Sequence, residues 1–298
     1  MKKAVSILLT LIIVSGLFSS CAGKEKTVQI GSVTVGRGIY EYFLCEAKKS
    51  NPDSPEKEAE KETLKYVAVN TKFKELELSL DTSQKALASK NTNNYWHLFS
   101  DYYKQQGIKK NDVYSAELSK EYLKAIIRSI YDKDGTNPIP EKAIKDYFSE
   151  NYVAYKAIIE LLQTTDENGN AVDLTDEKRD NVAKQFSQMK KSIDGGTSFE
   201  KVNAAYQAKG LENEADSEQV MLLSKASKAF PTGTFDQIMK IERKKSGVFT
   251  AGKYIFLVER VGEFDDKSFY EQYRDDCLVE LGMKAFEKTL DSWADSIK

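Results

Sequence analysis

The side chains that could perform acid–base, metal or nucleophilic chemistry are few in this sequence. The chain of 298 residues has one histidine, His97, and three cysteines. One histidine cannot form a two-histidine metal site, and neither Cys45 nor Cys277 has a neighbouring histidine to activate its thiol. Adjacent carboxylates such as Asp265-Asp266 do not face a common point on a helix. Without a glycine-rich phosphate loop, a Gly-x-Ser-x-Gly turn or zinc-ligand spacing, the sequence predicts no metal and no cofactor.

The third cysteine, Cys21, follows a segment ordered like a secretory signal peptide, with Lys2-Lys3, an apolar run and then Ser19-Ser20. Phe18-Ser19-Ser20-Cys21 resembles the lipobox of bacterial lipoproteins, with Phe where Leu is commoner. This resemblance implies that residues 1–20 are removed and that Cys21 becomes an amino terminus acylated with chains such as palmitate. An ordinary signal peptide or a membrane-spanning anchor are the alternatives, although about 15 apolar residues are short for a span. We therefore expect an extracytoplasmic protein held on a membrane by lipid.

An aromatic cluster surrounds the single histidine. His97 could act as a pH switch, but we interpret it as a helix residue beside these rings. The rings could line a cradle for unfolded chain segments, or they could form an ordinary helical core with some surface tyrosines. The aromatic residues concerned are Tyr95, Trp96, Phe99, Tyr102, Tyr103 and Tyr114.

Composition and charge indicate a globular protein without a nucleic-acid site. Hydrophobic residues make up 41% and charged residues 30% of the chain, and prolines are few. The formal charge is −2, and it becomes −4 when Lys2 and Lys3 leave with the leader. Because nucleic-acid binding requires a basic stripe, this balance argues against it.

The elements that must position these residues form two groups along the chain. The first group is a tether at 21–27, a hairpin around Gly31-Ser32, and four helices expected at 37–49, 55–80, 82–106 and 111–131. Residues 132–140 concentrate turn formers and predict a domain boundary.

The second group predicts a compact mixed α+β unit. It starts with a short helix at 141–149 and a strand at 155–162, and after a polar loop at 164–173 it continues to a strand at 254–261. Between them we expect helices at 175–193, 199–208 and 235–241 and a strand at 220–223. A last amphipathic helix from 265 to the end would expose a long apolar stripe, so we expect it to pack on the N-terminal helices.

Several segments of this second group resemble the extracytoplasmic foldases of the PrsA and SurA type, in which a helical chaperone domain carries a parvulin peptidyl-prolyl isomerase domain. The segment 139–158 looks like the start of that isomerase domain, and Ile193-Asp194-Gly195-Gly196-Thr197-Ser198-Phe199-Glu200 is similar to its helix pair. The most specific segment, 246–257, resembles the closing turn and strand of parvulins. The resemblance covers roughly residue 28 to the end.

The chain departs from the parvulin pattern at the positions that matter for catalysis. The family's two strand histidines are replaced here by Ala157, in Lys156-Ala157-Ile158, and by Tyr254. Of the proline-pocket residues only Phe235 matches, and Pro231 falls where a methionine is usual. The family's Gly-Gly-Asp-Leu segment is not recognisable at 216–223. We take Ala157, Phe235 and Tyr254 as candidates for a degenerate pocket and name no catalytic residue.

The predicted fold class is therefore α+β, with a discontinuous helical chaperone-like domain from both chain ends, 28–138 and 265–298. A small parvulin-like α+β domain, 139–264, is inserted between them. Cys45 and Cys277 fall in the two parts of the helical domain, either as buried free thiols, which we favour, or as a disulfide.

The resemblance implies a membrane-anchored foldase or chaperone that binds unfolded, newly secreted polypeptides, with an isomerase domain that has lost its histidines. Whether the chain is an enzyme stays open. An active prolyl isomerase with a site rewired around Phe235 and Tyr254 is one alternative. A non-enzymatic adaptor lipoprotein with one dedicated partner is another, and the oligomeric state, a homodimer included, is not determined.

Overall fold

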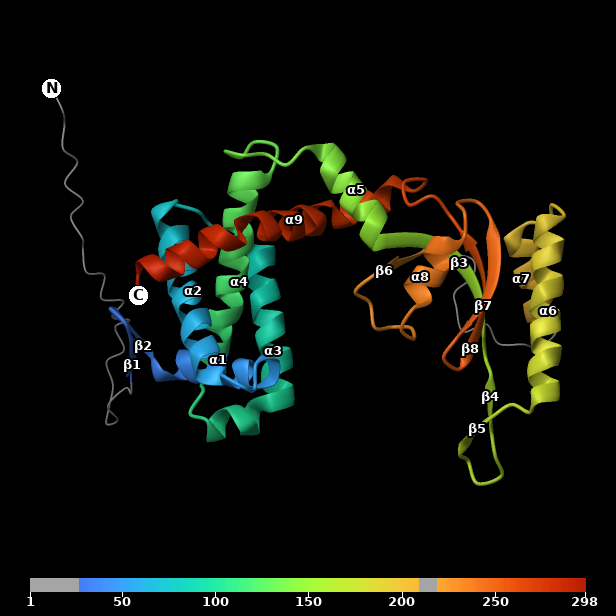
Figure 1. Ribbon diagram of the computed structural model, residues 1–298, viewed down its shortest axis with the longest axis horizontal. Helices are drawn as coiled ribbons and strands as arrows, with labels where there is room; N and C mark the ends of the chain where they lie inside the picture. Colours follow the sequence, from blue (N-terminus) through green and yellow to red (C-terminus); the bar gives the residue numbers. More distant parts are fainter. Residues whose placement is uncertain (1–26, 209–218) are drawn as a thin grey trace. The chain divides into compact units, whose positions relative to one another are not determined.

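The structure is a computed structural model that describes residues 27–208 and 219–298 (Figure 1). The predicted leader, the predicted lipid-attachment residue Cys21, most of the tether and the segment around Asp216 lie outside these residues. The chain forms two compact units. Unit 1 contains the residues up to Asn70, Thr82–Ser119 and Trp293–Lys298, and unit 2 contains Thr71–Asp81 and Lys120–Ser292. The described residues are mostly helical with one four-stranded antiparallel sheet, which confirms the α+β class.

Unit 1 is a helical unit with a small hairpin. Its core joins α1, α3 and the start of α4 through buried Tyr42, Cys45, Tyr103, Ile108 and Val113. The hairpin contributes Ile30 to a second buried cluster with Leu64 and Ala294. The elements that lie wholly or partly in this unit are β1 (Thr27–Ile30), β2 (Val33–Gly36), α1 (Arg37–Ser50), α2 (Pro55–Glu75), α3 (Thr82–Gln105) and α4 (Lys110–Tyr131).

Helix α2 ends five residues before the position that the apolar pattern predicts. Glu77 takes a left-handed conformation, with φ of 52°. The N–H of Leu78 then donates to the carbonyl of Phe73 at 3.2 Å, which closes the helix in the way a glycine usually does. The sequence gives no sign of this stop, because no glycine stands at the cap.

Unit 2 contains the sheet, whose strand order is β6-β3-β8-β7 with every neighbour antiparallel. Strand β3 starts at Tyr152, three residues earlier than predicted, because residues 152–155 pair with β6. The predicted polar loop after it contains a short hairpin, β4–β5. The elements are α5 (Glu141–Asn151), β3 (Tyr152–Leu161), β4 (Gln163–Thr165), β5 (Ala171–Asp173), α6 (Asp176–Asp194), α7 (Phe199–Gln207), β6 (Met221–Ser224), α8 (Thr234–Lys240), β7 (Ser246–Ala251), β8 (Tyr254–Arg260) and α9 (Lys267–Ser296).

The sheet has helices on both faces (Figure 1). Alternation along β3 sends Ile158 toward α6 and α7, where it meets buried Phe186 and Tyr206. The opposite face packs against α8 through Phe235 and Ile238. Below we call the face against α8 the α8 face. Each face therefore has its own apolar core.

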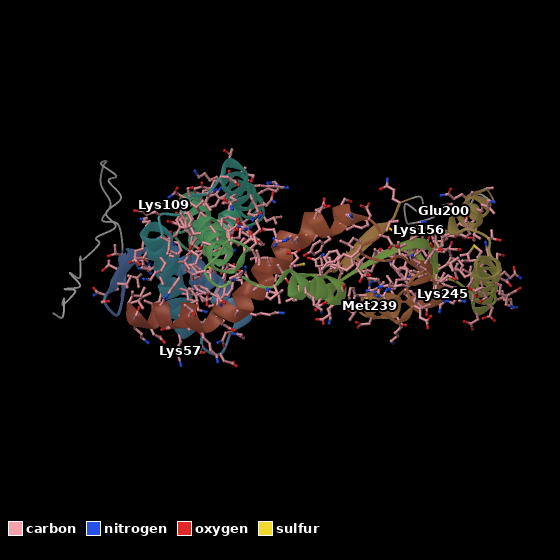
Figure 2. All side chains as sticks on the ribbon, turned by 90° about the horizontal axis from the view of Figure 1, so that it is seen from above. Lys57, Lys109, Lys156, Glu200, Met239 and Lys245 are labelled. Atoms are coloured by element: carbon pink, nitrogen blue, oxygen red, sulfur yellow. The ribbon has the colours of Figure 1, made fainter. Side chains whose placement is uncertain are left out.

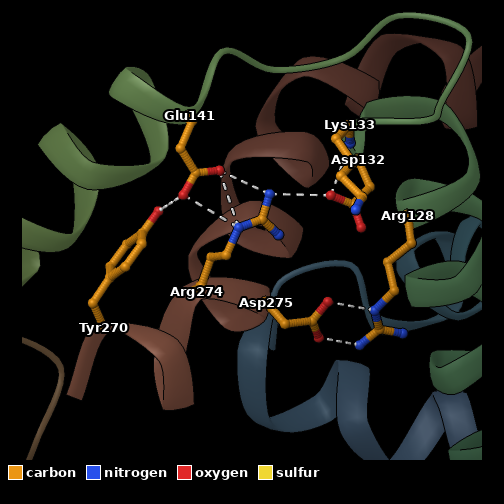
Figure 3. Close-up of polar contacts among 7 residues, drawn as sticks. All are labelled: Arg128, Asp132, Lys133, Glu141, Tyr270, Arg274 and Asp275. Carbon is orange, nitrogen blue, oxygen red and sulfur yellow. Dashed lines mark hydrogen bonds and ion pairs between the residues drawn. The ribbon is translucent and has the colours of Figure 1, made fainter. Parts of the chain in front are cut away.

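Helix α9 is tied to α4 and α5 by a polar network (Figure 3). The guanidinium of Arg274 donates to Glu141 at 2.9 Å and to Asp132 at 3.1 Å. Arg128 makes a two-pronged bond to Asp275, at 2.7 and 2.5 Å. Helix α9 thus contacts the end of α4, and it also contacts α5, which was not predicted. The packing of the last helix on the N-terminal helical domain as a whole stays a prediction.

Cys45 lies in unit 1 and Cys277 in unit 2, and both are buried free thiols. Burial raises the pKa of Cys277 to about 12. Such a thiol is protonated and unreactive at neutral pH. The interpretation of two separate buried thiols therefore agrees with the structure.

Candidate functional site

Strand β3 places Ala157 at the centre of the α8 face. Val153, Tyr155, Ala157 and Ile159 alternate onto this face and are all buried. Ala157 pairs with Val258 of β8 and is fully covered. A methyl group therefore fills the place at which the resemblance to parvulins implies an imidazole.

Phe235, the second candidate, reaches the same face from α8. The helix begins after Gly233, and the hydroxyl of Thr234 donates to the carbonyl of Pro231 at 2.8 Å. This turn fixes the first residues of α8 above the sheet, with Phe235 nine-tenths buried among the β3 side chains.

Tyr254, the third candidate, starts β8 directly after the β7–β8 turn. It pairs with Ala251 and Leu161 and lies half-buried at the edge of the same cluster. In that turn Gly252 has φ of 54°, and a Cβ there would come within 2.9 Å of the Pro231 side chain. Only glycine fits, because it has no Cβ to clash and tolerates positive φ.

The structure thus brings Ala157, Phe235 and Tyr254 together in one apolar cluster with aromatic edges. The rings of Phe249 and Phe256 stack at 4.9 Å, and Phe230 meets Phe256 edge-on at 5.7 Å. Whether these three residues form a ligand pocket stays a prediction.

Sequence reasoning did not single out Tyr155, the hydroxyl inside this cluster. Its ring is almost fully buried, and burial raises its pKa to about 12. A phenol with this pKa can donate a hydrogen bond but cannot exchange a proton efficiently near neutral pH. The face can therefore hold apolar groups, and acid–base catalysis by its described side chains is not expected. The alternation of β3 could have identified Tyr155.

The opposite face of β3 is polar at its margins and holds the helices in place. Lys156 forms an ion pair with Glu200 of α7 (Figure 2). Tyr206 donates a hydrogen bond of 2.6 Å to Glu160. These contacts fix the helix pair on the sheet and leave the α8 face to the apolar cluster.

A second candidate surface lies in unit 1, where large apolar side chains of α3 face solvent. Their spacing along the helix places them within one arc of about 120°, so they form one stripe. We call these residues the α3 stripe. Its members and their exposed fractions are Leu87 41%, Tyr95 38%, Leu98 68%, Phe99 38% and Tyr102 41%.

The α3 stripe rests on a buried ring. Tyr103 is 1% exposed, and the rings of Trp96, Phe99 and Tyr102 surround it at centroid distances of 6.0 to 6.2 Å. The ammonium of Lys49 lies 5.2 Å from the centre of the Phe99 ring. The stripe is therefore a fixed surface on a packed helix.

The aromatic residues expected to form either a cradle or a core divide between the two roles. Tyr95, Phe99 and Tyr102 are exposed, Tyr103 is core, and the other two, Trp96 and Tyr114, are half-buried. Leu87 and Leu98 were not predicted as part of this surface, although their helical spacing from Tyr95 and Tyr102 could have indicated them. His97 is exposed on the same helix.

Among the residues that the structure describes, no helix is both long enough and apolar enough to cross a membrane. The acidic and cysteine side chains in this part of the chain, with His97, form no group of three or more that could hold a metal ion.

Comparison with solved structures finds foldase proteins that are similar to this chain over about 90% of its length. The foldase protein PrsA from Streptococcus pneumoniae is 12% identical, with 90% of this chain and 92% of that chain covered and a TM-score of 0.45. PrsA from Lactococcus lactis is 13% identical, with coverages of 90% and 88% and a TM-score of 0.37. PrsA from Bacillus subtilis is 10% identical, with both coverages at 92% and a TM-score of 0.34. No protein-family model and no curated protein sequence matches the chain.

Proposed function

We propose that this protein is a membrane-anchored, extracytoplasmic foldase that binds unfolded secreted polypeptides without ATP. The observation on which the proposal rests is the α3 stripe, because a group of exposed large apolar side chains on a fixed helix marks an interaction surface. Binding through such a surface is weak, reversible and tolerant of sequence, as a chaperone requires.

The test uses the chain from Ala22 onward, which lacks the leader and Cys21, and follows aggregation of several unrelated denatured proteins by light scattering after dilution. Replacing Leu87 and Leu98 together with glutamine removes apolar surface without removing a side-chain hydrogen bond. We expect the double variant to need several-fold more protein for the same suppression. Its unfolding free energy should stay within about 0.5 kcal/mol of the parent, because both sites are exposed.

The matched control replaces Asn93 and His97, which are exposed polar residues of the same helix, with glutamine. This control should suppress aggregation like the parent. Equal suppression by all three proteins would reject the α3 stripe as the binding surface. Tight binding of one protein, without suppression of the others, would instead support the adaptor alternative.

We propose that the part of unit 2 that contains the four-stranded sheet is a degenerate isomerase domain without efficient prolyl isomerase activity. The apolar environment of Ala157 and the high pKa of Tyr155 support this proposal. The meeting of Phe235 and Tyr254 in one cluster favours the alternative, a rewired site, because isomerisation needs a desolvated pocket more than it needs proton transfer.

A proline-limited refolding assay separates the two. We expect no acceleration by the parent. Acceleration that Phe235→Ala and Tyr254→Ala both abolish, in variants whose unfolding transition is intact, would establish the rewired isomerase. Each tenfold of rate corresponds to about 1.4 kcal/mol of barrier, so partial activity is also measurable.

We also propose that Cys21 carries the lipid anchor. Labelling cells with radioactive palmitate should label the parent but not Cys21→Ser, and only the parent should fractionate with membranes. Labelling of both proteins would place the lipid elsewhere.

A further inference from the structure

Strand β7 forms one edge of the four-stranded sheet, and β8 is its only strand neighbour among the described residues. The two strands are joined by the two-residue turn Gly252-Lys253, so the flanking pair Ala251 and Tyr254 exchange backbone hydrogen bonds. The bonding then alternates along the strand. Phe249 and Gly247 bond to β8, whereas the N–H and C=O groups of Val248 and Thr250 point away from the sheet.

This outward row of backbone groups has no partner in the described part of the chain. No backbone hydrogen bond joins Val248 or Thr250 to another element there. At the start of the strand, the hydroxyl of Ser246 donates to Asp194 of α6 at 3.3 Å, so that end is covered. Thr250 is exposed and Val248 is only partly buried, which leaves the second half of β7 open.

An extended polypeptide is the ligand that such an edge fits, because a strand added to a sheet satisfies this row of donors and acceptors. Its side chains would lie beside Phe249 on the α8 face and beside Val248 on the other face. Both are only partly buried and belong to the two apolar cores. Alternating apolar residues in the ligand would therefore cover apolar surface on both sides.

The charged side chains near β7 indicate which kind of polypeptide would bind there. Exposed lysines flank the edge, with Lys245 before β7 and Lys253 in the turn after it. Lys244 is also exposed, and its ammonium is 3.9 Å from the carboxylate of Asp265. If two copies of this chain paired through β7, either strand direction would bring lysines against lysines, which destabilises a cross-strand pair. Carboxylates at the ends of the added strand would instead be attracted.

We infer that β7 is a docking strand for extended client segments that have an apolar, β-prone centre and acidic ends. The inference rests on the proposed function, because its occupant is a client polypeptide. It adds a site of different chemistry, since the backbone of β7 recognises the main chain of the client and the α3 stripe recognises its side chains.

The probe is the fluorescein-labelled peptide Glu-Glu-Val-Thr-Val-Thr-Val-Glu-Glu, and its binding to the chain from Ala22 onward is followed by anisotropy at low salt. Thr250→Pro removes the outward N–H and no bond to β8, whereas the matched control Thr250→Ala removes the same side chain and keeps the N–H. We expect Thr250→Pro to weaken binding by about tenfold and Thr250→Ala to leave it within about twofold. A peptide with lysines in place of the glutamates should bind several-fold more weakly.

Amide hydrogen exchange of the unmodified protein gives a readout that does not depend on a variant. The peptide should slow exchange at Val248 and Thr250 and leave Phe249, already bonded to β8, unchanged. Equal affinity of the proline and alanine variants, or no change at Val248 and Thr250, overturns the inference. So does a dimer, seen by sedimentation, that only Thr250→Pro dissociates, because the edge would then serve a second copy.

The two proposals fail separately. If the parent does not bind the peptide but still suppresses aggregation, β7 is rejected as a docking strand and the proposed foldase function is kept. Peptide binding at β7 without suppression of aggregation rejects the foldase.

Discussion

At the scale of single residues, Ala157 and Tyr254 determine what the α8 face can do. A histidine at either place would add a group that titrates near neutral pH. The methyl group of Ala157 adds none, and its fully buried position leaves no room for a larger side chain. The two positions nevertheless differ in packing, because Tyr254 is half-buried at the margin of the cluster.

This difference predicts unequal costs for putting histidine back. Ala157→His should lower the unfolding free energy by about 1–3 kcal/mol, because it overpacks a full core. Tyr254→His should cost less, since a ring replaces a ring beside solvent. Urea unfolding measures both. Equal costs would mean that the core around Ala157 adapts, and a gain of isomerase activity in the double variant would show that the site lacks only its imidazoles.

At the scale of elements, Arg274 joins α9 to the end of α4 and the start of α5. Burial raises the pKa of Glu141, but hydrogen bonds from Arg274 and Tyr270 outweigh it, so the pKa lies below its usual 4.5. The pKa of Asp132 is lowered in the same way, because hydrogen bonds from the Lys133 N–H and from Arg274 outweigh the effect of burial, which raises the pKa. Carboxylates with lowered pKa values stabilise the fold above their unfolded pKa values, and that stability is lost as the pH falls through the folded ones.

Arg274→Met should therefore destabilise the protein by about 1–2 kcal/mol at neutral pH, a modest figure because the partners are partly exposed. The difference from the parent should shrink as the pH is lowered below 4.5, the usual pKa of a glutamate such as Glu141, and falls through the lowered pKa values of the folded state. Denaturant unfolding at several pH values measures it. Lys142→Met, which removes an exposed ion pair with Asp146 on α5, is the control and should cost under about 0.5 kcal/mol. A difference independent of pH would mean that Arg274 contributes only packing.

At the scale of the whole molecule, the two ends of the described chain meet inside unit 1. The Ser32 N–H donates to the carbonyl of Lys298 at 3.0 Å, and its hydroxyl donates to Ile297 at 2.6 Å. Gly31 has φ of 57°, and a Cβ on it would lie 2.0 Å from the Lys298 oxygen. Both tryptophans of the sequence, Trp96 and Trp293, also belong to unit 1, so tryptophan fluorescence reports on this unit.

Gly31→Ala should lower the stability seen by tryptophan fluorescence by about 1–3 kcal/mol, because it adds both a left-handed strain and a clash. Gly36→Ala is the matched control in the same hairpin. Gly36 has an ordinary φ of −59° and nothing within 4 Å of an added Cβ, so this change should be neutral or slightly stabilising. Removing Lys298 should reduce the cost of Gly31→Ala. An unchanged cost would place the whole effect in backbone strain.

The elements whose signals are local were predictable from the sequence. Thr175 caps α6 by accepting from the Lys178 N–H at 3.4 Å, and the helix, which was expected at 175–193, runs from Asp176 to Asp194. The α2 stop at Glu77 and the early start of β3 at Tyr152 were missed. The first has no glycine to mark it, and the second depends on pairing with β6, about 70 residues later in the chain.

The candidate site shows the same division. Residue identity alone establishes that the chain has one histidine, that alanine and tyrosine stand at the two positions compared above with the parvulin histidines, and that aromatic residues make up 11% of the chain. The fold was needed to show that Ala157, Phe235 and Tyr254 share one apolar face, that Tyr103 is core while Leu98 is exposed, and that β7 is an edge strand of the sheet. Burial and strand order depend on contacts between residues far apart in sequence, which no local pattern contains.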